Sequence, residues 1–206
     1  MAEIDLYLDP VCPFAWVTSR WLLAAADDSP HTVRLWQMSL AVLNEGHDVD
    51  ADHRPMIDRS RRLGRVFAAA TETAGSDAFT RLYNSVGTRL HVNGGDIGTP
   101  ALAEALAEAG LDPALLRSLN DAGLDITVTA AHRVSQDALG GRGGSPIIVI
   151  DGQGFTGPVL TETPAAQQGP ALLAAIVTAA TTPGFAALQR PYQGPPRIDH
   201  RTEAAH

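Results

Sequence analysis

The single cysteine of this chain, Cys12, lies between a short apolar run and the start of a helix, and this placement constrains the fold more than any other feature. Residues 4–8 alternate as a half-buried strand does, and Asp9-Pro10 ends that strand. A proline follows the cysteine, and proline is favoured at the first position of a helix. The sequence therefore predicts a strand, a Cys-Pro turn and a helix, in that order.

A thiol at the start of a helix faces unpaired backbone N–H groups and the positive end of the helix dipole. Both favour the thiolate, so the pattern predicts for Cys12 a pKa below the ~8.5 of a free cysteine. The alternative interpretation is a small buried hydrophobic side chain without a chemical role. Thioredoxin-type proteins present their nucleophilic sulfur in this order of elements, with a Cys-x-x-Cys pair at the helix start. Here Ala15 replaces the second cysteine. The chain cannot form an internal disulfide and must act as a monothiol.

Composition excludes several classes of function. All 15 basic residues are arginines, so Schiff-base, pyridoxal phosphate and P-loop lysine chemistry are excluded. A net charge of −8 argues against a nucleic-acid partner, and neither a metal-binding spacing nor a second cysteine is present. Residues 171–180 are too few to cross a bilayer. The N-terminus lacks a secretory signal pattern, so we expect a cytoplasmic protein without membrane association.

The order of the remaining patterns predicts an α/β fold. We expect one thioredoxin-like domain over residues 1–190, with a four-stranded sheet and an inserted helical subdomain that covers the sulfur. The expected thioredoxin core comprises residues 1–54 and 140–190, the helical insertion residues 55–139, and a loosely held tail residues 191–206. The individual predictions are strands at 32–40, 145–151 and 155–160, a hairpin turn at 151–154 and a helix from Pro170 to Pro183.

Pro146 stands at the head of the strongest buried-strand pattern, where a missing backbone N–H is tolerated. A cis peptide bond at this position would turn the backbone groups of Ser145 outward. Ser145 and Pro146 are therefore predicted to contact a bound chain or thiol.

Four motifs carry a family resemblance. Residues 9–21, 38–46, 87–91 and 155–160 resemble the DsbA-like family that includes the actinobacterial mycothiol-dependent nitroreductases, and the likeness extends to about Gln189. Kappa-class glutathione transferases and hydroxychromene carboxylate isomerases are similar at a greater distance. The resemblance implies a cytoplasmic thioredoxin fold with a helical insertion, a nucleophilic Cys12 and a cis-proline at Pro146.

The resemblance also implies that Phe14 and Asn44 line the active pocket. Phe14 replaces the usual tryptophan of the family and lacks its indole N–H donor, and Ala15 replaces a cysteine that characterised reductases of the family keep. The complete set of candidates comprises one catalytic residue and seven substrate- or thiol-binding residues: Cys12, and Pro13, Phe14, Trp16, Asn44, His91, Ser145 and Pro146. His91 is a candidate proton donor or orienting group, with a purely structural role as the alternative.

Three functions fit these residues. The first is an oxidoreductase that depends on mycothiol or a similar low-molecular-weight thiol, which resolves an intermediate at Cys12. The second is an isomerase in which reversible addition of a thiol to a conjugated alkene permits rotation; it needs no resolving cysteine. The third is a non-catalytic thioredoxin-like binding protein. We expect a small-molecule substrate, apolar or conjugated because of Phe14, Trp16 and Trp21, and no metal. The oligomeric state stays open.

Overall fold

A four-stranded mixed sheet forms the centre of the protein, for which a computed structural model describes residues 1–95 and 97–198. The strands are β1 (Glu3–Leu8), β2 (Thr32–Gln37), β3 (Ile147–Ile150) and β4 (Gln153–Thr156). Their spatial order is β2-β1-β3-β4, with β1 and β2 parallel and the other pairs antiparallel. The predicted α/β class and four-stranded sheet are confirmed.

Strand β1 lies between β2 and β3 and separates two cores. Its residue Leu6 pairs with Leu35 of β2 and Ile148 of β3, and all three are buried in the larger core. Tyr7 points to the opposite face, where it packs with Met38 in a smaller cluster. Because successive side chains of a strand alternate between faces, β1 contributes to both cores. Cys12, which follows β1, is buried in the larger core.

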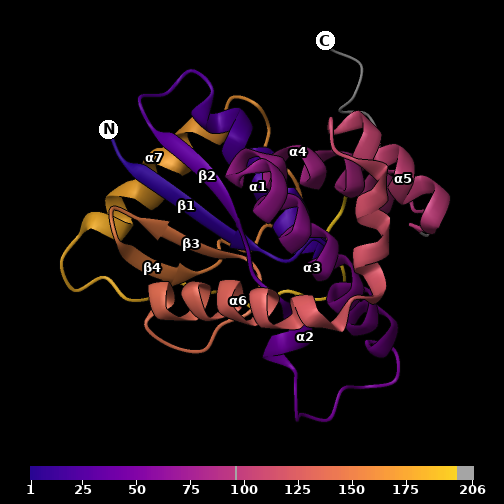
Figure 1. Cartoon of the computed structure of the whole chain (residues 1–206). Helices are drawn as coiled ribbons and strands as arrows, with labels where there is room; N and C mark the ends of the chain where they lie inside the picture. The colour runs from indigo at the N-terminus through magenta and orange to yellow at the C-terminus, as the bar shows by residue number, and fades with distance from the viewer. Residues whose placement is uncertain (96, 199–206) are drawn as a thin grey trace.

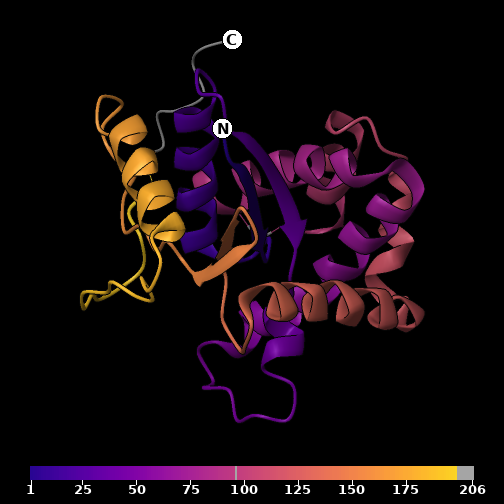
Figure 2. The same ribbon diagram turned by 90° about the vertical axis from the view of Figure 1, so that its left-hand side faces the viewer.

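Helices cover both faces of this sheet (Figures 1 and 2). Helices α1 and α7 pack together on one side, where the indole Nε1 of Trp21 donates to the Gly169 carbonyl at 3.2 Å. Helix α6 lies on the other side, against β2, β3 and β4. The bounds of the helical elements are α1 (Pro13–Ala26), α2 (Leu40–Leu43), α3 (Arg54–Ala74), α4 (Ser76–Gly87), the π-helix η1 (Thr88–Val92), α5 (Thr99–Glu108), the 3-10 helices η2 (Pro113–Asn120) and η3 (Ala122–Leu124), α6 (Asp125–Leu139) and α7 (Gly169–Thr181).

Two predicted boundaries are wrong. The strand expected to reach residue 40 ends at Gln37, because Ser39 caps α2 and its hydroxyl accepts from the Val42 N–H at 3.2 Å. The β3–β4 hairpin turn needs only two residues, Asp151 and Gly152, since both adopt positive φ angles of 48° and 82°. The partner strand therefore begins at Gln153 and ends at Thr156.

Within residues 1–95 and 97–198, no helix combines the length and apolar character needed to cross a membrane. In the same ranges, no group of three His, Cys, Asp or Glu side chains is arranged to hold a metal ion.

Gly154 allows β4 to approach the C-terminal end of α6. A Cβ added there would lie 2.2 Å from the Ala138 carbonyl oxygen and 2.7 Å from Leu139 Cα, which are backbone atoms with little freedom to move. We expect Gly154→Ala to lower the free energy of unfolding by about 1–3 kcal/mol, measured by urea denaturation.

The control for this prediction is Gly141→Ala, because a Cβ at Gly141 would contact nothing within 4 Å. Equal stability of the two variants would contradict the close approach of β4 to α6.

Candidate functional site

Cys12 occupies the N-cap position of α1, with Pro13 as the first helical residue. Its Sγ donates to the Ser145 carbonyl oxygen at 3.3 Å, and the backbone N–H groups of Ala15 and Phe14 face the sulfur. The predicted strand, Cys-Pro turn and helix therefore place the thiol at the helix start, beside the loop that precedes β3.

The predicted low pKa of this thiol is wrong. Only 5% of Cys12 is exposed, and burial raises its pKa above the ordinary value. The N–H groups of Ala15 and Phe14 act in the opposite direction, whereas the negative charge of Asp9 adds to the rise. Loss of hydration outweighs the helix terminus here because burial penalises the charged form directly. The resting group is a protonated thiol that donates to Ser145.

A buried carboxylate organises the turn before Cys12. Asp9 is 1% exposed and accepts hydrogen bonds from the Val11 N–H at 2.9 Å, the Leu40 N–H at 2.7 Å and the Ser60 hydroxyl. Its own N–H donates to the Ser145 hydroxyl at 3.0 Å. Asp9 thereby connects the end of β1 with α2, α3 and the loop before β3. Burial raises the pKa of Asp9, and these hydrogen bonds oppose that rise.

Trp16 and His91 pack against each other next to the cysteine turn, residues 9–12. Their rings stack with centroids 5.6 Å apart, and His91 Nε2 lies 2.9 Å from the Pro10 carbonyl oxygen. Because the carbonyl only accepts, Nε2 carries the hydrogen. Burial lowers the pKa of His91 to about 4, so the ring is neutral at pH 7. Gly87 gives Trp16 its space, since a Cβ there would lie 2.1 Å from the indole.

Of the aromatic residues expected to face an apolar substrate, Phe14 alone is partly exposed. Trp16 and Trp21 are buried, because Trp16 packs against His91 and Trp21 against α7. The ring of Phe14 makes an edge contact with Tyr192 at a centroid distance of 5.3 Å. The expected three-aromatic surface is therefore corrected to Phe14, whose ring is in contact with Tyr192.

Pro146 and Asn44, which the family resemblance also implies, lie in different surroundings. The peptide bond between Ser145 and Pro146 is cis, and Ser145 contacts the sulfur. Asn44 ends α2, and its side-chain amide donates to the Leu40 carbonyl at 2.8 Å. The structure thus shows a helix-capping contact for Asn44 and none that joins it to Cys12.

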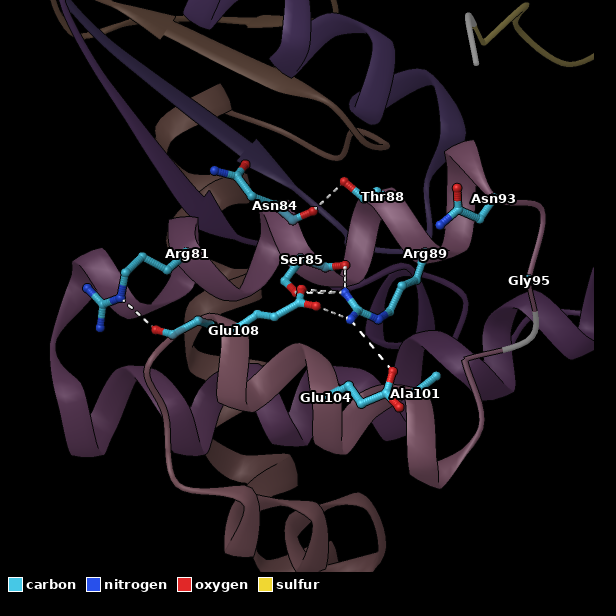
Figure 3. A pocket seen from close by; sticks show the side chains of 11 residues that line it. Arg81, Asn84, Ser85, Thr88, Arg89, Asn93, Gly95, Ala101, Glu104 and Glu108 are labelled. Atoms are coloured by element: carbon cyan, nitrogen blue, oxygen red, sulfur yellow. Dashed lines mark hydrogen bonds and ion pairs between the residues drawn. The ribbon is translucent and has the colours of Figure 1, made fainter. Parts of the chain in front are cut away.

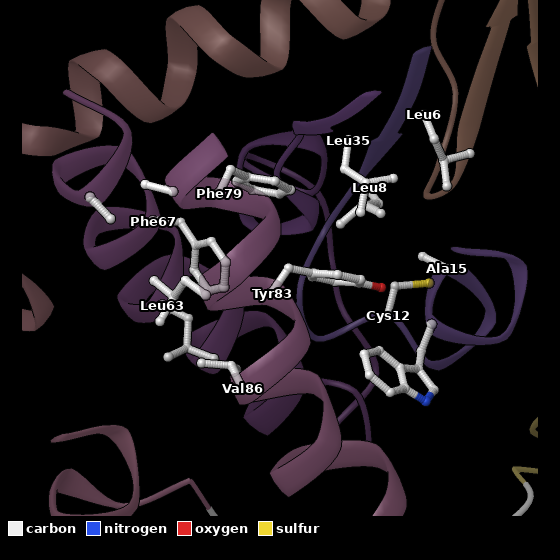
Figure 4. Packing of buried hydrophobic residues seen from close by; sticks show 14 of the residues in the cluster. Leu6, Leu8, Cys12, Ala15, Leu35, Leu63, Phe67, Phe79, Tyr83 and Val86 are labelled. Carbon is white, nitrogen blue, oxygen red and sulfur yellow. The ribbon is translucent and has the colours of Figure 1, made fainter. Parts of the chain in front are cut away.

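Two residues of the site, Tyr83 and Asp9, were not predicted from the sequence. Tyr83 is buried on α4 and points towards Cys12 at the end of a row of aromatic rings (Figure 4). Its hydroxyl lies 3.4 Å from the Ser19 hydroxyl, and burial raises its pKa. Asp9 had a usable signal, an acidic residue directly after a buried strand. Tyr83 had no such sequence signal, since a tyrosine in a helical pattern is common in hydrophobic cores.

A hollow of about 840 Å³ lies away from Cys12, along α4 and next to η1 and α5 (Figure 3). Its lining includes Arg81, Asn84, Arg89, Glu104 and Glu108, and Arg89 pairs with both glutamates. None of the predicted site residues lines it. The hollow is lined by the hydroxyls of Ser85 and Thr88 but by no thiol, so Cys12 stays the candidate reactive group.

Alkylation of Cys12 by iodoacetamide should titrate with a midpoint above the ~8.5 of a free cysteine, because burial disfavours the thiolate. The rate is measured from pH 6 to 10 by intact mass. The same thiol in concentrated urea is the control and should titrate near ~8.5. A native midpoint below the denatured one would contradict the assignment.

His91 should make stability depend on pH. The unfolded chain binds a proton at this ring near pH 6.5 and the folded protein near pH 4, so acidification between these values favours unfolding. From pH 6.5 to 5 this loss amounts to about 2 kcal/mol. In His91→Gln, which keeps a donor for Pro10, the urea-unfolding free energy should fall by less over this range. Identical pH slopes for both proteins would refute this role.

Known proteins resemble this chain in sequence and in fold. Uncharacterized protein Rv2286c of Mycobacterium tuberculosis is 30% identical over 197 residues, which cover 93% of this chain and 83% of that protein. The crystal structure of the probable DsbA oxidoreductase SCO1869 from Streptomyces coelicolor has a TM-score of 0.60 at 17% identity, with coverage of 93% of this chain and 94% of that one. The cytosolic disulfide reductase DsbM from Pseudomonas aeruginosa, solved with GSH, has a TM-score of 0.54 at 18% identity, covering 85% of this chain and 99% of that one.

These structures confirm the DsbA-like thioredoxin fold. A family model described as Rv2466c-like, mycothiol-dependent nitroreductase Rv2466c, matches residues 11–190. That match begins at the cysteine turn and includes the loop of Ser145 and Pro146. The chain therefore belongs to the Rv2466c-like family and is a thiol-dependent oxidoreductase.

Proposed function

We propose that this protein is a monothiol oxidoreductase in which Cys12 forms a mixed disulfide that an external low-molecular-weight thiol, mycothiol in the first instance, resolves. The observation that carries the proposal is one sulfur at the N-terminus of α1, in contact with the Ser145 carbonyl, in a chain without a second cysteine. The description of the matching family names mycothiol as the thiol.

The geometry supports each role of the sulfur. When Cys12 loses its proton, the N–H groups of Phe14 and Ala15 stabilise the resulting thiolate. The Ser145 carbonyl, now without the thiol donor, is free to accept from an N–H of a bound thiol or disulfide. Ser145 and the start of α1 thus together form a small binding surface.

The cycle conserves atoms and electrons. The Cys12 thiolate attacks one sulfur of a small-molecule disulfide, a new S–S bond forms, and the other sulfur leaves as a thiolate. Cys12 is released as a thiolate when an external thiolate attacks the substrate-derived sulfur of that bond. The external thiol supplies the second sulfur that Ala15 cannot provide. Exchange with a further thiol molecule then frees the substrate as its thiol and leaves the external thiol oxidised to its disulfide.

The proposal includes a small substrate and a cytoplasmic location. The partly exposed ring of Phe14 presents an apolar surface two residues after Cys12, which suits an apolar or conjugated substituent on the substrate. Low-molecular-weight thiols keep the cytoplasm reducing, and a monothiol cycle depends on that supply.

Incubation with mycothiol disulfide should add one mycothiol unit to the wild-type chain, detected by intact mass, and Cys12→Ser should gain nothing. Once the mycothiol released by this exchange has been removed by desalting, the adduct should persist until free mycothiol is added, because the chain holds no resolving thiol. In Ala15→Cys the adduct should disappear without added thiol as an internal disulfide forms. Ala15→Ser is the matched control and should retain the adduct.

Two outcomes would count against the proposal. Loss of the adduct from the desalted wild-type protein without added thiol would show that the mixed disulfide is resolved without an external thiol. Conversion of a conjugated alkene with mycothiol unconsumed would favour the isomerase alternative.

A further inference from the structure

The C-terminal segment, residues 191–198, returns to the N-terminal end of α1. The ring of Tyr192 meets the ring of Phe14 in an edge arrangement, with centroids 5.3 Å apart and planes inclined by 62°. Figures 1 and 2 show the yellow end of the chain leaving α7 and running back past α1. This contact is formed by residues nearly the whole chain length apart, so it is tertiary rather than local.

A second attachment holds the same segment six residues after Pro191. The backbone N–H of Arg197 donates to the Thr161 carbonyl at 2.7 Å. Thr161 follows β4 in a stretch that is itself bound to α1, because the Thr18 hydroxyl donates to the Pro158 carbonyl at 2.8 Å. The segment is therefore fastened at one end to the first turn of α1 and at the other to a neighbour of α1.

Burial supports both attachments. Pro196 is buried and Ile198 packs against the core cluster that contains Cys12. An exposed segment that buries apolar side chains gains stability from being ordered, which offsets its loss of conformational entropy. Tyr192, by contrast, is 46% exposed, so its contact with Phe14 is the more easily broken of the two.

The surroundings of the sulfur leave few approaches. Only 5% of Cys12 is exposed, and the Ser145 loop covers one side of it. Trp16 and Tyr83 are buried behind it. Phe14, two residues beyond the cysteine, is partly exposed, and the ring of Tyr192 lies against it. A molecule that approaches past Phe14 must therefore pass Tyr192.

We propose that residues 191–198 cover the approach to Cys12 and, through Tyr192, restrict it to small thiols and disulfides while excluding proteins and other bulky reactants. This inference rests on the proposed function only in taking Cys12 as the reacting group. Tyr192 is then a residue that determines specificity by size. It acts by occlusion and takes no part in bond making.

The test compares two maleimides of identical chemistry and different size on the full-length chain. N-ethylmaleimide reports access to Cys12 for a small molecule, and a maleimide on a long polyethylene glycol chain reports access for a bulky one. Tyr192→Ala removes the ring and should raise the bulky reagent's rate roughly threefold to tenfold, as expected from loss of one aromatic contact. The rate with N-ethylmaleimide should stay within twofold.

The second attachment offers a matched pair of variants. Arg197→Pro removes the N–H that donates to Thr161 and should also accelerate the bulky reagent selectively. Arg197→Ala keeps that N–H and removes only the exposed ion pair of the side chain with Glu162 at 3.6 Å, which contributes little. It should behave as wild type, as should Tyr192→Phe, which keeps the ring. Leu188→Ala, at a side chain that is 90% exposed, controls for substitutions outside the cover.

The ratio of the bulky reagent's rate to the N-ethylmaleimide rate decides the outcome. Selective acceleration of the bulky reagent in Tyr192→Ala and Arg197→Pro supports the cover. Unchanged rates, or equal acceleration of both reagents, would overturn it, since equal acceleration indicates a general loosening of the site. Formation of the mixed disulfide with mycothiol disulfide tests Cys12 chemistry separately and does not depend on this ratio.

Discussion

The site depends on the buried carboxylate of Asp9. Its oxygens accept from Val11, Leu40 and Ser60, three donors that lie on the cysteine turn, α2 and α3. A buried carboxylate is costly without such donors, and removal of any partner leaves an unsatisfied group. The geometry of the turn is therefore set by a requirement for hydrogen bonding. Because the N–H of Asp9 also donates to Ser145, one residue places both the helix start and the loop that contacts the sulfur.

Two opposing influences act on the sulfur, and burial is the stronger. The helix start contributes N–H groups that lower the thiol pKa, whereas loss of water and the charge of Asp9 raise it. Sequence reasoning reached the first influence, since it follows from the position of Cys12 before Pro13. The second depends on packing by α4, which begins 64 residues after Cys12, and by Ser145, which lies 133 residues after it. A local pattern contains no measure of that burial, and for this reason the predicted direction was wrong.

The same distinction explains which elements were predictable. The order of strands and helices followed from periodicity and from proline and glycine at element ends, and it was correct from β1 to α7. Errors arose where a side chain competes with the backbone, as at Ser39, which ends β2 early by capping α2. Among the candidate site residues, Cys12 and Ser145 are brought into contact by the fold. Asn44 was taken from a family motif, and its observed partner is the backbone of its own helix.

A raised thiol pKa is consistent with a monothiol cycle. In a mixed disulfide, the thiol with the lower pKa leaves more readily. A buried Cys12 is therefore a poor leaving group when the intermediate is attacked, unless the helix N–H groups receive its charge. In a dithiol enzyme a neighbouring sulfur attacks at high effective concentration and overcomes a poor leaving group. Ala15 removes that advantage. In the proposed cycle the intermediate at Cys12 is therefore long-lived, and its lifetime depends on which external thiol can reach it.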